Sequence, residues 1–424
     1  MEIPSKAGRA RFVNVFRVTK LRLKPPSDDP SASESSLLGG RCAAAKTAFK
    51  AQPAKTCFIR CDIGFRRCLA LIWLVIVLPV VTGSIQRAGS PTPASLAAQG
   101  AVTARVVAAA SAFLATLSDA ERAKCTFGFA SSQRTGWSNL PTGIFQRNGL
   151  RFGDMTPRQR DAALALVAAA LSREGYKKVT DIMNGDEVLR NAGGGRTGGR
   201  QGGAGGAGGR GSGVRFGLDE YYIALLGAPS ATAPWMIQFG GHHLAINVTV
   251  VGPNNVLTPS LPAAQPAKYT LNGQTIRPLG HENDKGFALI NALNPAQQKQ
   301  AVLNYEVRDL VLGPGADGKV IQPEGILASA LDAGQQGLLL DVVREWVGIL
   351  NDEAAAAKMA EINVNLPRTY FAWSGTTKNG GLAYYRIQGP TVVIEYAPQQ
   401  GDLDHIHTIY RDPTNDYGAK LVVP

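Results

Sequence analysis

The stretch YYRIQGPTVVIEY, residues 384–396, places aromatic and β-branched residues on both sides of Gly389-Pro390. Such runs around a turn signal are typical of strands, so they predict a hairpin or a bent strand. Similar runs predict strands at 235–239, 243–251 and 405–410. The strand-forming sequence is therefore concentrated in the second half of the chain.

The predicted helices begin with a shared capping pattern, at 156–159, 294–297 and 332–335. In each, a side-chain acceptor stands three residues before a Gln that can reach back to the cap amide. These starts predict helices over 157–174, 295–303 and 333–350, the first ending at Gly175, and another helix follows over 351–363. Small apolar residues predict one more helix over 102–117. We therefore expect an α+β fold, with a helical N-terminal half packed on a mainly antiparallel sheet that includes the C-terminal strands.

The N-terminal segment differs in composition from the rest of the chain. Residues 1–67 carry 14 Lys and Arg against five Asp and Glu, out of a net charge of +12. The apolar run CLALIWLVIVLPVVTG, residues 68–83, follows and is typical of a secretory signal. It is short for a spanning helix, which needs about 20 apolar residues, although an uncleaved anchor is the alternative. This profile predicts a secreted or periplasmic protein, with membrane contact only through an uncleaved leader.

The sequence predicts a leader over 1–84, a linker over 85–100 and one domain over 101–424. A glycine-rich tract over 191–217 is expected to be a disordered insertion, because it has almost no apolar surface to bury. Cys125 is the one cysteine after the leader, so a disulfide framework is excluded for the domain. Because the basic excess lies in the leader and the glycine tract, we expect a small-molecule substrate and no nucleic-acid partner. The oligomeric state is left open.

The five histidines fall in three places, His242-His243, His281 and His405-x-His407. Residues two apart in a strand point to one face, so His405 and His407 can lean onto one divalent ion. Adjacent residues of a strand point to opposite faces, so at most one of His242 and His243 can join the other two histidines. His243 is preferred. In that strand Asn247 shares its face with His243. The alternative is that the imidazoles bind no metal and form hydrogen bonds with carboxylates in a polar core.

Several other residues are candidates for the same site. Glu282 is the expected fourth ligand or general base, with Asp404 and Asp412 as rivals. Arg411 or Arg386 is expected to orient an anionic substrate through its planar fork of donors. His242, His281, Tyr385 and Glu395 are expected around the site or against the substrate. A cross-strand ion pair is the alternative for Arg386 and Glu395.

The motifs WMIQFGGHHLAIN (235–247), GHEN (280–283), YYRIQGPTVVIEY (384–396) and HIHTIYRDPTNDYG (405–418) resemble a bacterial family catalogued as domain of unknown function number 3500. The resemblance covers about residues 101–421 and implies an export signal, but it implies no reaction.

Two classes of function follow from these features. The first is an exported metal-dependent hydrolase that acts on a small anionic or polar substrate, with zinc, iron, manganese or copper as the divalent ion. Metal-dependent redox chemistry is its nearest alternative. The second is a non-catalytic binding protein of the cell envelope, with structural histidines. The sequence has no GxSxG, phosphate-loop or HExxH motif, which argues against serine hydrolases, nucleotide-dependent enzymes and zincins.

Overall fold

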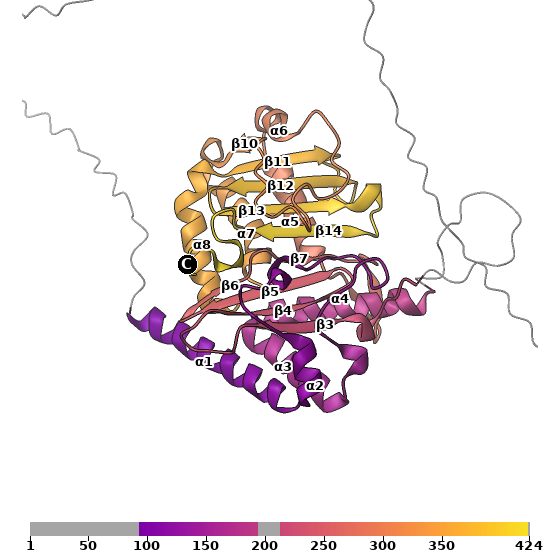
Figure 1. The fold of residues 1–424 in the computed structure, drawn as a ribbon. Helices are drawn as coiled ribbons and strands as arrows, with labels where there is room; N and C mark the ends of the chain where they lie inside the picture. Colours follow the sequence, from indigo (N-terminus) through magenta and orange to yellow (C-terminus); the bar gives the residue numbers. More distant parts are fainter. Residues whose placement is uncertain (1–92, 194–212, 423–424) are drawn as a thin grey trace, which may run out of the picture. The chain divides into compact units, whose positions relative to one another are not determined.

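Two large β-sheets, a two-stranded hairpin and eight α-helices form most of the part of the chain that the computed structural model describes, residues 93–193 and 213–422 (Figure 1). The predicted leader, and all of the predicted glycine-rich insertion except its two edges, lie outside these residues. The helices are α1 (Pro93–Ala115), α2 (Asp119–Cys125), α3 (Pro157–Ala170), α4 (Arg173–Asn191), α5 (Gly280–Ala292), α6 (Pro295–Ala301), α7 (Ala333–Val347) and α8 (Asp352–Asn365).

The first sheet has the order β1-β3-β4-β5-β6, with β2 also paired to β3 and β7 to β5. Its strands are β1 (Thr126–Phe127), β2 (Leu150–Arg151), β3 (Tyr222–Leu226), β4 (Trp235–Gly241), β5 (Leu244–Val251), β6 (Asn254–Val256) and β7 (Leu261–Pro262). The pairing of β1 with β3 is parallel, and the other pairings are antiparallel. A separate hairpin consists of β8 (Tyr269–Leu271) and β9 (Gln274–Ile276).

The second sheet is an antiparallel meander in chain order. Its strands are β10 (Ile326–Leu327), β11 (Tyr370–Gly375), β12 (Ala383–Gly389), β13 (Val392–Pro398) and β14 (Ile406–Arg411). Gly389 pairs with Val392 across the turn, so the predicted hairpin in 384–396 is confirmed. Apolar residues at alternate positions, such as Phe371 and Trp373, join the core with the helices. The predicted α+β fold is confirmed.

The two sheets meet along the segment that follows β6. Within it, β7 pairs with β5, while bridges join Ser260 to Tyr410 and Ala264 to Ile406 of β14. Figure 1 shows β7 between the two sets of strands. A short extended segment therefore brings the start of β5 next to the start of β14.

The predicted capping boxes are present, with Thr156, Asn294 and Asp332 as N-caps and Gln at the third helical position. The predicted end of the first of these helices, at Gly175, is wrong. Helix α3 ends at Ala170, and Ser172 caps a new helix by accepting the amide N–H of Gly175. The position of Gly175 is instead explained by packing. A Cβ there would lie 2.1 Å from the carbonyl oxygen of Ile349, so only glycine fits.

Helix α1 begins at Pro93, inside the segment predicted as a linker. Its segment Ala97–Ala115 is the one helical stretch of the described residues that is long and apolar enough to cross a membrane, judged by length and composition alone. In the structure α1 contacts α3, α8 and β6, and Val102, Val106 and Phe113 are fully buried. Helix α1 therefore packs one of its sides against the core of the domain.

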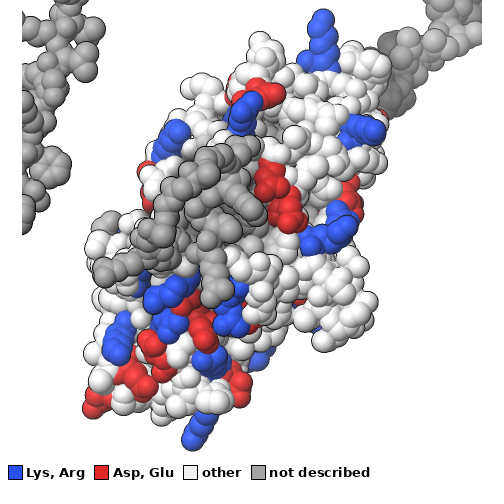
Figure 2. Space-filling view, turned by 90° about the vertical axis from the view of Figure 1, so that its right-hand side faces the viewer, with Lys and Arg blue, Asp and Glu red and all other residues white. Residues whose placement is uncertain are grey.

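Charged side chains of both signs are interspersed on the face drawn in Figure 2, most densely in its lower half. No surface of one sign dominates the described part of this face. A basic stripe of the kind that tracks a phosphate backbone is therefore not seen there.

Candidate metal centre

Three histidine side chains from two distant parts of the chain converge on one point. Nε2 of His405 lies 2.8 Å from Nε2 of His243 and 3.1 Å from Nε2 of His407. Their ligand nitrogens all lie within 4.8 Å of one another, and no other such group occurs in the described residues. Tetrahedral ligands at about 2.1 Å from an ion lie about 3.4 Å apart, so this spacing is near that of a metal site. The three imidazoles can hold a metal ion.

His242 and His243 form the two-residue turn between β4 and β5, where the sequence predicted that His243 begins a strand. Gly241 pairs with Leu244 across the turn, and His243 has a φ of 61°. This left-handed conformation is uncommon for a residue with a side chain. Because the pair lies in a turn, strand alternation does not apply, and the two rings lie 3.7 Å apart instead of on opposite faces.

The His242 ring anchors this turn to helix α4. Its Nδ1 lies 2.6 Å from Oδ1 of Asp186, and both side chains are buried. The other carboxylate oxygen of Asp186 accepts the backbone N–H of Gly217 at 2.7 Å. A buried carboxylate therefore fixes the ring that lies against His243.

His407 lies in β14, and His405 immediately precedes this strand. Thr408 accepts a hydrogen bond from Nε1 of Trp346 in α7 at 3.0 Å, so its side chain faces the helices. Since neighbouring strand residues alternate, His407 faces the other side of the sheet. There its Nδ1 lies 2.8 Å from Oδ1 of Asp309. Donation from Nδ1 to this carboxylate leaves the Nε2 lone pair free for a ligand bond.

The surroundings lower the pKa of two of the three converging imidazoles. Burial, reinforced by the neighbouring imidazoles, lowers the pKa of His405 to about 4 and holds the pKa of His243 well below its usual value. For Asp309, burial favours a higher pKa, but its contact with His407, chiefly the hydrogen bond from the ring, brings the pKa below the usual value. A neutral imidazole is the form that binds a metal ion, while the ionised Asp309 orients one of the three rings.

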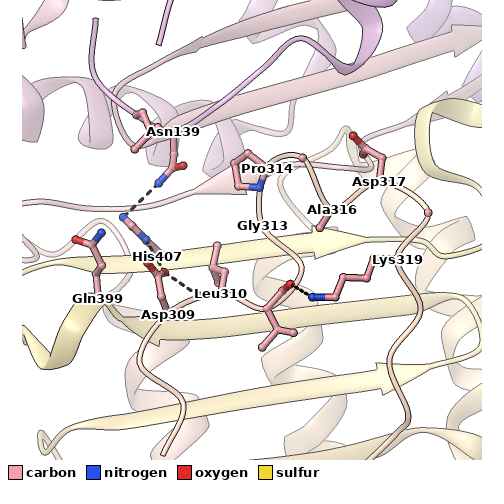
Figure 3. Close-up of a pocket in the computed structure, with 14 residues that line it drawn as sticks. Asn139, Asp309, Leu310, Gly313, Pro314, Ala316, Asp317, Lys319, Gln399 and His407 are labelled. Carbon is pink, nitrogen blue, oxygen red and sulfur yellow. Dashed lines mark hydrogen bonds and ion pairs between the residues drawn. The ribbon is translucent and has the colours of Figure 1, made fainter. Parts of the chain in front are cut away.

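A polar pocket with a volume of about 590 Å³ opens beside this cluster (Figure 3). His407 reaches it from β14, Asn139 from the loop before β2, and Asp309 from the segment that follows α6. Its other lining residues are Leu140, Leu310, Val311, Gly313, Pro314, Gly315, Ala316, Asp317, Gly318, Lys319 and Gln399. The imidazole cluster therefore has a route to a cavity large enough for a small molecule.

Asn139 binds to both parts of the cluster. Its backbone carbonyl accepts the N–H of His243 at 3.0 Å, and its Nδ2 lies 3.2 Å from Nε2 of His407.

A model of the family described as a protein of unknown function, DUF3500, matches residues 99–419. The chain belongs to the DUF3500 family. No curated protein and no solved structure matches the chain.

The matched DUF3500 region contains all five histidines, together with Asn139, Asp186 and Asp309. The family description supplies no reaction, so the chemistry of the site rests on its geometry.

The DUF3500 domain does not bring Glu282 to the imidazoles, which corrects the prediction that it is the carboxylate ligand. Glu282 is fully buried and forms an ion pair with Lys178 of α4. Its helix α5 packs with α7, and its carbonyl oxygen accepts the hydroxyl of Tyr385 from the helix side of the sheet. His407 points to the opposite side. The carboxylate that reaches the cluster is Asp309, and it binds a ring instead of completing the ligand set.

Arg411, Arg386 and Glu395 lie on the same sheet face as His407, but they do not line the pocket. Arg411 donates to the carbonyl oxygens of Leu312 and Gly313 and also pairs with Asp317 and Asp416. Arg386 is 3% exposed and binds Glu324. Glu395 lies opposite Arg386 in the register but accepts the amides of Val311 and Leu312 and the hydroxyl of Tyr384. These side chains anchor the 303–325 segment, which forms the pocket wall.

The remaining candidates are placed elsewhere in the DUF3500 domain. Asn247 is buried in β5 and donates to the carbonyl of Pro259, at the junction of the sheets. His281 is exposed and lies 3.8 Å from Glu345. Asp412 pairs with Lys358, and Asp404 accepts the amide of Ala267. Tyr385 stacks between Trp373 and Tyr396 in the core behind the sheet. Of the predicted surrounding residues, only His242 touches the cluster.

Three residues of the DUF3500 site had no signal in the sequence, namely Asn139, Asp186 and Asp309. Asn139 and Asp309 lie in irregular segments, where no periodicity predicts the direction of a side chain. Asp186 lies in α4, which the sequence did not predict. Asp309 does stand near the run GPGADGK, whose glycines and proline mark an exposed loop, and such loops often carry binding residues.

Proposed function

We propose that this chain is an exported metal-dependent enzyme, a hydrolase, in which His243, His405 and His407 bind one divalent ion beside a polar substrate pocket. The convergence of three Nε2 atoms at 2.8 and 3.1 Å carries the proposal. Without an ion, the three rings have few protons to share among themselves, because a neutral imidazole has one N–H, and His407 directs its own toward Asp309. An ion at the meeting point would satisfy all three lone pairs.

Three neutral protein ligands leave the full charge of a divalent ion to act on a fourth group. Such an ion would supply an acidified water or a polarised carbonyl, which is the chemistry of metal-assisted hydrolysis. The residues of the chain have the other tasks. Asp309 holds the tautomer of His407, and the Asp186–His242 pair holds the turn that carries His243.

The pocket lining favours a small polar substrate over an anionic one. Amides, backbone groups and the carboxylates Asp309 and Asp317 line it, against the single cation Lys319, whose Nζ donates to the carbonyl of Val311 at 3.2 Å. The two arginines considered for an anion are buried under the pocket wall. Export rests on the apolar run at 68–83, which lies outside the described residues.

Metal analysis of the purified domain, residues 84–424, tests the proposal. We expect about one ion per chain, lost in the double variant His405→Ala, His407→Ala. The matched control is His281→Ala, which removes an exposed imidazole and should leave the metal content unchanged. Protein that takes up no metal from zinc, iron, manganese or copper solutions, and whose melting temperature does not respond to chelator, would overturn the proposal in favour of a binding protein with structural histidines.

The bound ion then decides between hydrolysis and redox chemistry, because imidazole ligands suit zinc, iron and copper. Turnover of ester, amide or phosphoester probes by the zinc form supports the hydrolase. Activity that requires iron or copper together with oxygen supports the oxidoreductase alternative.

A further inference from the structure

Asn139 binds both halves of the histidine cluster from a third segment of the chain. Its carbonyl oxygen accepts the His243 N–H at 3.0 Å, and its side-chain amide lies 3.2 Å from Nε2 of His407. The side chain is 7% exposed and borders the pocket (Figure 3). Asn139 therefore places a side-chain amide beside one of the three imidazoles, at the border of the pocket.

An ion at the centre changes what the amide of Asn139 can do. The amide N–H groups can donate to His407 only while the Nε2 lone pair is free, and a ligand bond occupies that lone pair. The oxygen and nitrogen of an asparagine amide have nearly the same size, and rotation about the last side-chain bond exchanges them within one volume. After this exchange, Oδ1 takes the place that Nδ2 holds, 3.2 Å from His407 Nε2. That spacing matches the 2.8 and 3.1 Å between the imidazole nitrogens.

We propose that the side-chain oxygen of Asn139 is the fourth protein ligand of the metal centre. This inference rests on the proposed function, since it requires that the histidines bind an ion. A carbonyl oxygen adds no charge, so the ligand set stays neutral and the ion keeps its full charge toward a water or substrate. A water or substrate would then take a fifth position, on the side of the pocket that Asn139 and His407 both border.

Arg147 positions this ligand and the histidine turn together. Its guanidinium is buried and donates to the carbonyl oxygens of Ser138 at 2.8 Å and Gly241 at 2.7 Å, and also to that of Leu140. The first and last of these residues flank Asn139, while Gly241 precedes the His242-His243 turn. One cation therefore sets the distance between the proposed fourth ligand and His243, and Arg147 acts as a positioning residue.

The test compares the wild-type domain with Asn139→Ala and Asn139→Asp, using cobalt(II) as the probe. Affinity is measured by competition with a chelator, and the ligand set is followed by the visible absorption of the bound cobalt. We expect affinity to fall at least tenfold in Asn139→Ala, with an altered spectrum, and to be retained or raised in Asn139→Asp, whose carboxylate supplies the same oxygen. Both substitutions keep the backbone bond to His243.

Asn148→Ala is the matched control, because this exposed asparagine of the same loop donates to Gln133 and does not border the pocket. It should bind cobalt with the wild-type affinity and spectrum. An Asn139→Ala variant that also behaves as wild type in both measurements overturns the fourth ligand and leaves the three-histidine centre standing. A wild-type domain that binds no cobalt overturns both proposals.

Discussion

Ala264 and Ile406 each donate a backbone hydrogen bond to the carbonyl of the other, at 2.8 and 2.9 Å, across the boundary between the two sheets. The neighbouring residue, Ala263, donates to the carbonyl of His243 at 2.8 Å. The same short segment thus holds the turn that carries His243 and the strand β14, which contains His407 and directly follows His405. The distance between the imidazoles is therefore set by backbone pairing over residues 260–264.

Replacing Thr408 by Val tests this junction without changing a proposed ligand. The Thr408 hydroxyl donates to the carbonyl of Pro262 and accepts from Trp346 Nε1. Leaving these buried groups without a partner costs about 1–3 kcal/mol, so Thr408→Val should unfold at a lower urea concentration and bind metal more weakly. Thr408→Ser keeps the hydroxyl and should stay close to wild type. An equal loss in both variants would contradict a role for the hydroxyl, because Thr408→Ser retains it.

Asp309 should control metal affinity through the tautomer of His407. Asp309→Ala removes the acceptor for Nδ1, and loss of such a partner typically weakens metal binding about 10–100-fold. Chelator competition measures this change. The control is Asp341→Ala on the exposed surface of α7, where the carboxylate pairs with Arg344. Wild-type affinity in Asp309→Ala would show that the ring needs no second partner.

The local parts of this fold could be predicted from the sequence. Capping boxes depend on residues three apart, and the shared face of His405 and His407 depends on the two-residue period of a strand. The direction of Thr408 and His407 to opposite faces follows the same period.

The non-local parts could not be predicted. The sequence placed His243 in a strand, since nothing in Gly241-His242-His243-Leu244 indicates a turn whose third residue has positive φ. It assigned Glu282 to the site because of its neighbour His281, although helix α5 lies behind the sheet. Asn139 and Asp309 reach the cluster from irregular segments, whose paths depend on tertiary contacts such as those of Arg147 and Arg411.

Glu282 should affect stability and not metal binding. Burial raises the pKa of this carboxyl, and the nearby charge of Lys178 opposes that rise. Removing one member of a buried ion pair costs about 3–5 kcal/mol, whereas replacing both by apolar residues is often neutral. Glu282→Leu should therefore unfold far more easily than wild type, and adding Lys178→Met should restore much of the stability. Both variants should keep the wild-type metal content, and loss of metal from a folded Glu282 variant would restore its role as a ligand.

Asp284 gives a prediction for pH. Its carboxylate accepts two hydrogen bonds from Arg277, each of 2.8 Å, and this pairing lowers its pKa below the usual value. A depressed pKa stabilises the folded state above the unfolded-state value, and this contribution disappears as the pH falls through the folded-state pKa. The stability difference between wild type and Asp284→Asn, measured in chelator, should therefore be present near neutral pH and vanish in acid. A difference that does not change with pH would rule out the ion pair as its cause.

His243 combines a strained backbone with a proposed ligand, so two substitutions at this position should separate the two properties. Both His243→Gly and His243→Ala remove the imidazole and should abolish metal binding. With φ at 61°, glycine avoids a left-handed penalty of roughly 1–2 kcal/mol that alanine retains. In chelator, His243→Gly should therefore be more stable to urea than His243→Ala by about 1 kcal/mol.

The opposite order is expected at the exposed Ala108 of helix α1, where glycine costs about 1 kcal/mol relative to alanine. If alanine proves the more stable residue at position 243 as well, the turn must relax once the ring is gone. The positive φ would then be imposed by the contacts of the His243 ring with His242 and His405, which lie 3.7 and 4.7 Å away between ring centres. If glycine is the more stable residue at position 243 and alanine at position 108, the turn fixes the backbone of His243. If alanine is the more stable residue at both, the contacts of the His243 ring fix it.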